Sequence, residues 1–175
     1  MTHKEHHPVA VKISLETVEA IDKLIARYPT SEAALIPALH KVQDDVGWMP
    51  VEAMDWVATK LALPKVRVYG VASYYTMFLR EKPGKHQLEI CTNLSCSLMG
   101  AEHLRSYLEK KLGIRAGETS SDGRFTLTEV ECLGACGFAP VMIVDGEYHE
   151  NLDPKKVDEI LATLDRQDKE SGKNG

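Results

Sequence analysis

Long apolar runs are missing from this 175-residue sequence, and its first residues, Met1 to Pro8, are polar and rich in histidine. No segment is long and apolar enough to span a bilayer, and no secretory signal can be recognised at the start. Acidic and basic residues are interspersed, with a net charge of −5, which argues against a nucleic-acid partner. We therefore expect a soluble cytoplasmic protein without direct membrane insertion.

Catalytic motifs are absent as well. The segment Gly134-Ala135-Cys136-Gly137 has neither the spacing nor the strand–turn–helix context of a dinucleotide-binding loop. The seven histidines are scattered, and no Ser/His/Asp set is arranged for nucleophilic catalysis. His3, His6 and His7 are interpreted as solvated residues of the terminus, and His40 as a packed core residue of a helix. The chain alone is therefore expected to hold no complete active site.

Cysteine is scarce and occurs in pairs. Cys91 and Cys96 are separated by 35 residues from Cys132 and Cys136, and the sequence has no fifth cysteine. Disulfides belong to oxidising compartments and to chains too small to pack a core, and neither condition fits this chain. Structural zinc usually takes C-x2-C knuckles, which are tighter than the C-x4-C and C-x3-C loops found here.

A 2Fe–2S cluster is the third chemistry open to four thiols. Its two irons take two thiolates each, so two wider loops can enclose it. Gly134 and Gly137 would let backbone N–H groups approach the sulfur atoms. The apolar side chains expected to keep water from the cluster are Leu94, Leu98, Leu133, Ala135 and Phe138. The spacing favours the cluster, leaves zinc open, and differs from the plant-type ferredoxin pattern.

Helical periodicity dominates the first half of the chain. Ser14 can cap the first helix, and Arg27-Tyr28-Pro29 ends it. Further helices are predicted from Ser31 to Val46, from Pro50 to Leu61 and from Lys65 to Tyr75. Pro37 removes a backbone donor, so the start of the first of these is either kinked or postponed to about Ile36. Four short helices with short connections predict a small bundle over residues 13–80, preceded by a disordered tail over residues 1–12.

Strand and helix signals alternate in the second half. The predicted order is a strand at 86–90, a helix at 100–112, strands at 125–130 and 141–144, a hairpin strand at 147–149 after Asp145-Gly146, and a helix from Asp153 to Leu164. These elements form a predicted domain over residues 85–165. A disordered charged tail is predicted over residues 166–175.

Both cysteine pairs follow strand ends in this prediction. Cys91 ends the first strand, and Cys132 comes soon after the second. We expect these two strands to be neighbours, which would bring all four thiols to one site. Cys96 falls just before the predicted helix at 100–112, and a helix N-terminus favours an anionic cluster.

Two motifs resemble the thioredoxin-like 2Fe–2S ferredoxins. These are C-T-x3-C at Cys91–Cys96 and E-C-L-G-A-C-x2-A-P-V at Glu131–Val141. Within this family, the sequence most resembles the small NADH-dehydrogenase subunits of respiratory complex I. The helical stretch Val68–Phe78 is also similar to a segment of those subunits. The similarity runs from about residue 13 to about residue 164. It implies an α+β chain in which a helical bundle precedes a thioredoxin-like α/β domain with one 2Fe–2S cluster. The implied ligands are Cys91, Cys96, Cys132 and Cys136.

The same resemblance implies a one-electron carrier within NADH:quinone oxidoreductase. The implied partner is a larger subunit that binds FMN and NADH and has its own iron–sulfur cluster, in a heterodimer within a larger complex at the inner face of the cell membrane. Small subunits of NAD-linked formate dehydrogenases or bidirectional hydrogenases are the alternative, and a structural zinc-binding module is the non-redox alternative. Pro140 stands where such folds often have a cis proline.

Overall fold

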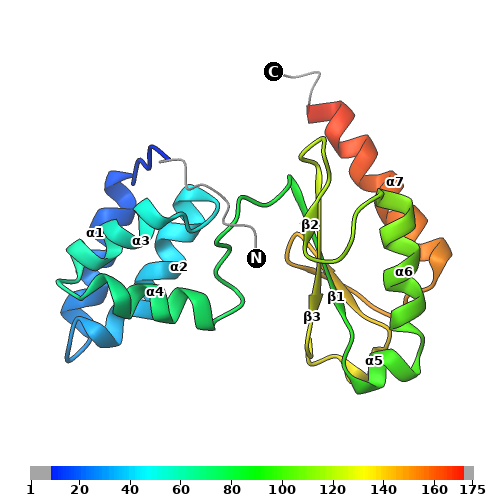
Figure 1. Cartoon of the computed structure of the whole chain (residues 1–175), viewed down its shortest axis with the longest axis horizontal. Coiled ribbons are helices and arrows are strands. Elements are labelled where there is room, and N and C mark those ends of the chain that lie inside the picture. The colour runs from blue at the N-terminus through cyan, green and yellow to red at the C-terminus, as the bar shows by residue number, and fades with distance from the viewer. Residues whose placement is uncertain (1–8, 172–175) are drawn as a thin grey trace. The chain divides into compact units, whose positions relative to one another are not determined.

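The computed structural model describes residues 9–171, and the chain divides between Lys82 and Pro83 into two compact units (Figure 1). The first unit is helical, and the second combines helices with a sheet. The three histidines predicted to be solvated, His3, His6 and His7, lie outside the described residues. The prediction that residues 1–12 form a disordered tail is wrong for residues 9–12. The Val9 N–H donates to Glu52 Oε1 at 3.0 Å, and Val11 packs on the helical core.

The helical unit confirms the four predicted helices. They are α1 (Leu15–Arg27), α2 (Leu35–Val46), α3 (Val51–Lys60) and α4 (Lys65–Tyr74), with a short 3-10 helix, η1 (Glu32–Ala34), ahead of α2. Ser14 caps α1, since its Oγ accepts a hydrogen bond from the Thr17 N–H at 3.2 Å. Gly47 ends α2 in the left-handed conformation, with φ of 85°.

The apolar faces of these helices meet in one core. Its fully buried members include Ile21, Leu39, Val42, Val57 and Val68. His40 is half-buried, and its ring lies 5.0 Å from the ring of Phe78, as expected for a packed histidine.

The second unit is built on a five-stranded sheet in the order β2-β3-β1-β4-β5. Its elements are β1 (His86–Cys91), α5 (Leu94–Leu98), α6 (Ala101–Leu112), β2 (Glu118–Thr119), β3 (Phe125–Val130), η2 (Cys136–Phe138), β4 (Met142–Val144), β5 (Glu147–His149) and α7 (Pro154–Ser171). Strands β1 and β3 are parallel neighbours, with Cys91 opposite Val130. This confirms the predicted pairing, and both strands therefore end at the same edge of the sheet.

Helices α6 and α7 lie on the same side of the sheet (Figure 1) and share one core with it. Leu88, Ile90 and Leu127 alternate inward from β1 and β3 to meet them. Strand β2 was not among the predicted strands. Two residues are too few to show an alternating pattern, and only pairing with β3 reveals the strand.

Helix α7 corrects a second prediction. It continues to Ser171, although residues 166–171 were predicted to be disordered. Asp168 lies in this last part, and it accepts hydrogen bonds from Lys85 Nζ at 2.6 Å and from the Arg124 guanidinium at 2.8 Å. Its other neighbour is His86 Nε2, at 3.1 Å. The ordered end of α7 could not be predicted from the sequence, because the partners of Asp168 are 44 residues or more away along the chain.

The Asp168 interactions predict a pH-dependent contribution to stability. The hydrogen bond from Lys85, with those from His86 and Arg124, holds the pKa of Asp168 well below its usual range. A carboxylate with a lowered pKa in the folded state stabilises fully above its unfolded pKa of about 3.9, and the contribution is lost as the pH falls through the folded value.

Asp168→Asn is therefore expected to lower the free energy of unfolding by about 1–2 kcal/mol at pH 7. Its difference from the wild type should shrink below about pH 4. Urea unfolding of both proteins at about pH 7 and at several pH values between about 4 and about 2 measures this. A difference that stays the same down to about pH 2 would contradict the prediction.

Candidate metal centre

The first cysteine pair lies at the end of β1. Cys91 is the last residue of the strand, and its N–H donates to the Val141 carbonyl oxygen at 3.1 Å. The next residue, Thr92, donates to the carbonyl oxygen of Val130 at 3.1 Å, so the chain stays paired with β3 just past Cys91. These backbone bonds position the Cys91 thiol between two strands.

Cys96 does not lie just before a long helix, as the sequence predicted, but inside the short helix α5. Asn93 caps α5 by accepting a hydrogen bond from the Leu94 N–H at 2.8 Å. Gly100, with φ of 97°, then separates α5 from α6. An Asn before a short apolar run is a recognisable N-cap, so the sequence did contain a signal for this helix.

The second pair lies in the loop after β3. Cys132 and Cys136 are exposed, and their Sγ atoms are 3.7 Å apart. The Gly134 N–H donates to Cys132 Sγ at 3.4 Å, with Gly134 in the left-handed conformation at φ of 79°. This confirms for Gly134 the expected approach of a glycine N–H to sulfur.

The two pairs are brought close to each other. Cys91 Sγ donates to the carbonyl oxygen of Glu131, the residue directly before Cys132, at 2.8 Å. Burial raises the pKa of the Cys96 thiol to about 11, and the neighbouring Cys91 and Cys136 add to the rise. A thiol in this environment stays protonated unless a cation compensates the thiolate charge, and metal ligation supplies that compensation.

The residues fit a two-iron group. All four cysteines are free thiols in this structure. The thiols lie as two pairs, one buried and one exposed, and two thiolates for each of two irons is the ligand arrangement of a 2Fe–2S cluster.

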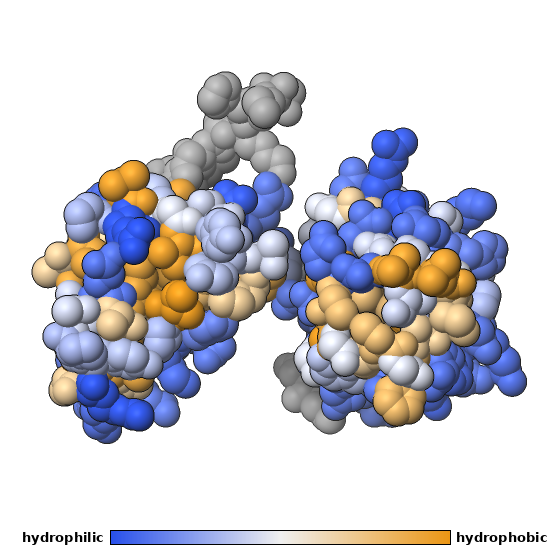
Figure 2. Space-filling model, turned by 90° about the horizontal axis from the view of Figure 1, so that it is seen from below, coloured by the Kyte–Doolittle hydropathy of each residue, from blue (hydrophilic) through white to orange (hydrophobic). Residues whose placement is uncertain are grey.

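Some of the apolar side chains near the cysteines are not placed as expected. Leu94, Leu98 and Phe138 were expected to keep water from the site, but they point outward and, together with Met99, are 53–79% exposed. We call these four residues the apolar rim, and Figure 2 shows apolar side chains gathered at this end of the second unit. The buried residues packed around the thiols are smaller, namely Ala101, Ala139 and Val141.

The Ala139–Pro140 peptide bond is cis, which confirms the prediction for Pro140. It directly precedes Val141, whose carbonyl oxygen accepts the hydrogen bond from the N–H of Cys91. A loop contact that the sequence did not predict joins β5 to the second pair, since the Tyr148 hydroxyl donates to the carbonyl oxygen of Leu133 at 2.8 Å.

A sheet covered by helices on one face, with two thiol pairs at the ends of parallel strands, defines the class of small iron–sulfur proteins built on a thioredoxin-like fold. The family model described as thioredoxin-like 2Fe–2S ferredoxin matches residues 21–165. The chain belongs to this family, and its cofactor is one 2Fe–2S cluster.

Two related proteins are E subunits of NADH-quinone oxidoreductases. An E subunit of the NADH-quinone oxidoreductase of Rhizobium meliloti, the one numbered 2, is 47% identical over 83% of this chain and 87% of its own length. The NADH-quinone oxidoreductase E subunit of Rickettsia conorii is 40% identical over 82% and 87%.

Among solved structures, an NAD+-reducing NiFe hydrogenase in the H2-reduced state matches 80% of this chain at 22% identity, with a TM-score of 0.69. This chain spans only 23% of that hydrogenase chain, and the match supports the fold alone. Within residues 9–171, every helix is too short or too polar to cross a lipid bilayer.

Proposed function

We propose that the chain is the one-electron carrier subunit in the NADH-oxidising module of respiratory complex I, and that Cys91, Cys96, Cys132 and Cys136 hold its cluster. The observation that supports this most is the convergence of both thiol pairs at the ends of β1 and β3. It occurs in a chain whose relatives at 37–47% identity are NADH-quinone oxidoreductase E subunits. The bound cluster supplies one-electron transfer, here from FMN on a partner subunit.

The chain's own groups divide the work of holding the cluster. Cys91 and Cys96 would hold its inner side, since both are only 2% exposed and anchored by β1 and α5. Cys132 and Cys136 would hold its outer side from a loop. The Gly134 N–H donates to sulfur, and such hydrogen bonds stabilise thiolate charge and tune the reduction potential.

The apolar rim supports a partner at this end of the second unit. Leu94, Leu98 and Met99 project from or directly after α5, beside the buried cysteine pair, and Phe138 follows the exposed pair. A protein that docks on the apolar rim would cover these exposed side chains and exclude water from the cysteines beside them. We propose that this partner is the larger subunit that binds FMN and NADH and has its own iron–sulfur cluster. The complex would hold the chain at the inner face of the cell membrane.

Metal analysis with spectroscopy of anaerobically purified protein tests the function. We expect about two irons per chain, visible absorbance that bleaches with dithionite, and an electron-paramagnetic-resonance signal that arises only on reduction. A colourless protein with about one zinc per chain would overturn the proposal and favour the structural zinc module.

A further inference from the structure

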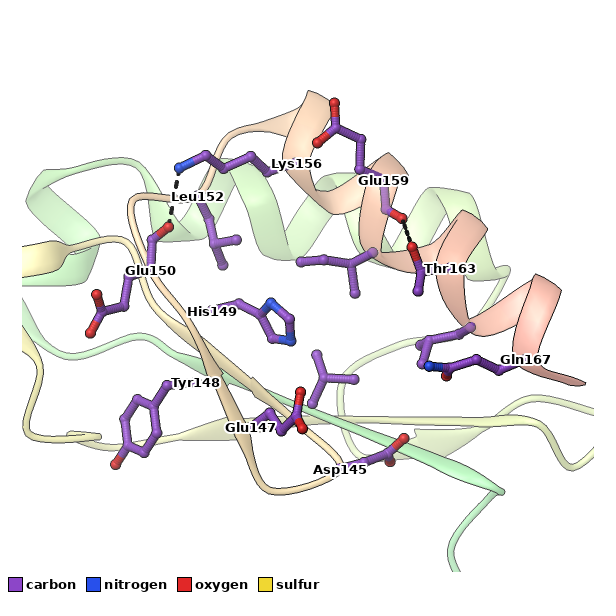
Figure 3. A pocket seen from close by; sticks show the side chains of 13 residues that line it. Asp145, Glu147, Tyr148, His149, Glu150, Leu152, Lys156, Glu159, Thr163 and Gln167 are labelled. Atoms are coloured by element: carbon purple, nitrogen blue, oxygen red, sulfur yellow. Dashed lines mark hydrogen bonds between the residues drawn. The ribbon is translucent and has the colours of Figure 1, made fainter.

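A groove of about 590 Å³ lies between β5 and α7, at one edge of the sheet (Figure 3). None of the four cysteines lines it, so it is separate from the proposed cluster site. Figure 3 shows His149 directed from β5 toward α7, while Tyr148 points away from the groove. One wall is therefore the edge strand itself, and the other is the exposed side of a helix.

The edge strand has backbone groups available for pairing. Val144 and Glu147 face each other across the two-residue turn at Asp145-Gly146 and begin the β4–β5 ladder. In an antiparallel hairpin, hydrogen-bonded and non-hydrogen-bonded pairs alternate, and the pair flanking a two-residue turn is hydrogen-bonded. The next residue of β5, Tyr148, therefore directs its N–H and C=O away from β4, along the open edge of the sheet.

The groove combines an apolar floor with an acidic border. The floor consists of Val144, Leu152, Ile160 and Leu164. Besides Asp145, which is hydrogen-bonded to His86 Nδ1 and the Gln87 N–H, the border carries the carboxylates of Glu147, Glu150 and Glu159. The one lysine of the lining, Lys156, donates to two backbone carbonyl oxygens, those of Glu150 and Asn151, at 3.3 and 2.8 Å. Three carboxylates around an apolar floor repel phosphate-bearing ligands and attract basic ones.

We propose that an extended segment of a partner protein adds to β5 as a further strand and fills this groove, with side chains that are alternately basic and apolar along its groove-facing side. Its backbone would pair with the outward N–H and C=O of Tyr148, as in other cases of strand addition. Successive side chains of a strand point to opposite faces, so every second residue would enter the groove. Among these groove-facing residues, apolar side chains would cover the floor, and Lys or Arg side chains two positions away would reach Glu147 and Glu159.

The test uses the full-length protein with its cluster in place and a fluorescently labelled synthetic peptide of repeating Lys-Thr-Val-Thr, called the Lys–Val peptide because its Lys and Val side chains share one face of the extended chain. We expect saturable binding in fluorescence anisotropy, with slower amide hydrogen exchange in β5 and at the groove side of α7. The same peptide with Glu in place of each Lys should bind at least about tenfold more weakly, because its charges are repelled. The Lys–Val peptide with alternate backbone nitrogens methylated should weaken similarly, because it cannot pair with Tyr148.

Matched variants locate the interaction. Glu147→Gln combined with Glu159→Gln is expected to weaken binding of the Lys–Val peptide about tenfold. Glu19→Gln combined with Glu170→Gln makes the same charge change at two exposed positions outside the groove and should leave binding unchanged. No binding of the Lys–Val peptide, equal binding of the methylated peptide, or equal weakening in both double variants would overturn the proposal. These outcomes are independent of iron content, which tests the electron-carrier function separately.

Discussion

Replacing Cys132 with alanine is expected to remove the 2Fe–2S cluster and leave the chain folded. Cys132 is exposed and lies in a loop, so losing its side chain opens no cavity in the core. It is one of four proposed ligands, and three thiolates leave one iron incompletely coordinated. Iron content and visible absorbance should fall nearly to zero, while far-ultraviolet circular dichroism stays close to that of the wild-type apoprotein.

Two further variants make this result specific. Cys96→Ala should also lose the cluster but destabilise the apoprotein in addition, because Cys96 is buried among small core residues. His40→Ala should retain the full cluster, since His40 packs on Phe78 in the helical unit. A Cys132→Ala protein with an unchanged visible spectrum would contradict the ligand assignment.

Two leucine replacements are expected to destabilise different parts of the chain. Leu127 is fully buried between the sheet and its helices, and Leu39 is fully buried in the helical unit. Each change to alanine should cost about 2–5 kcal/mol, from lost burial and the cavity left behind. The two compact units correspond approximately to the predicted domains over residues 13–80 and 85–165. We propose that each of them unfolds cooperatively and independently of the other.

Thermal unfolding followed by two signals measures this. The visible absorbance of the cluster reports on the second unit, while circular dichroism reports on both. Leu127→Ala should lower the temperature at which the cluster absorbance is lost, and Leu39→Ala should leave that temperature nearly unchanged. Equal shifts of the cluster signal in both variants would show that the units unfold together.

Much of the architecture could be predicted from local patterns. Ser14 and Gly47 mark helix ends through capping and a left-handed conformation, which depend on neighbouring residues only. The alternation in β1 and β3 identified the strands that precede both cysteine pairs. Cysteine spacing was enough to favour a cluster over structural zinc, because the C-x4-C and C-x3-C loops are wider than the usual zinc knuckles.

Other features could not be read in this way. The polar composition of residues 166–171 suggested disorder, yet Asp168 is held there by Lys85, His86 and Arg124. Strand β2 is too short to show a pattern, and it exists because β3 offers a partner. Leu133 packs beside the cysteines as expected, but nothing in the sequence showed that Leu94 and Leu98 point outward.

By itself, the sequence determined the helices of the first unit, the strands other than β2 and the four thiols of the candidate centre, because these depend on residues close together in the chain. Only the tertiary structure decided which side of the centre is buried, where α7 ends and where the groove beside β5 lies. The physical reason is that burial, ion pairs and sheet edges arise between segments distant in sequence, and a local pattern does not contain the partner that completes them.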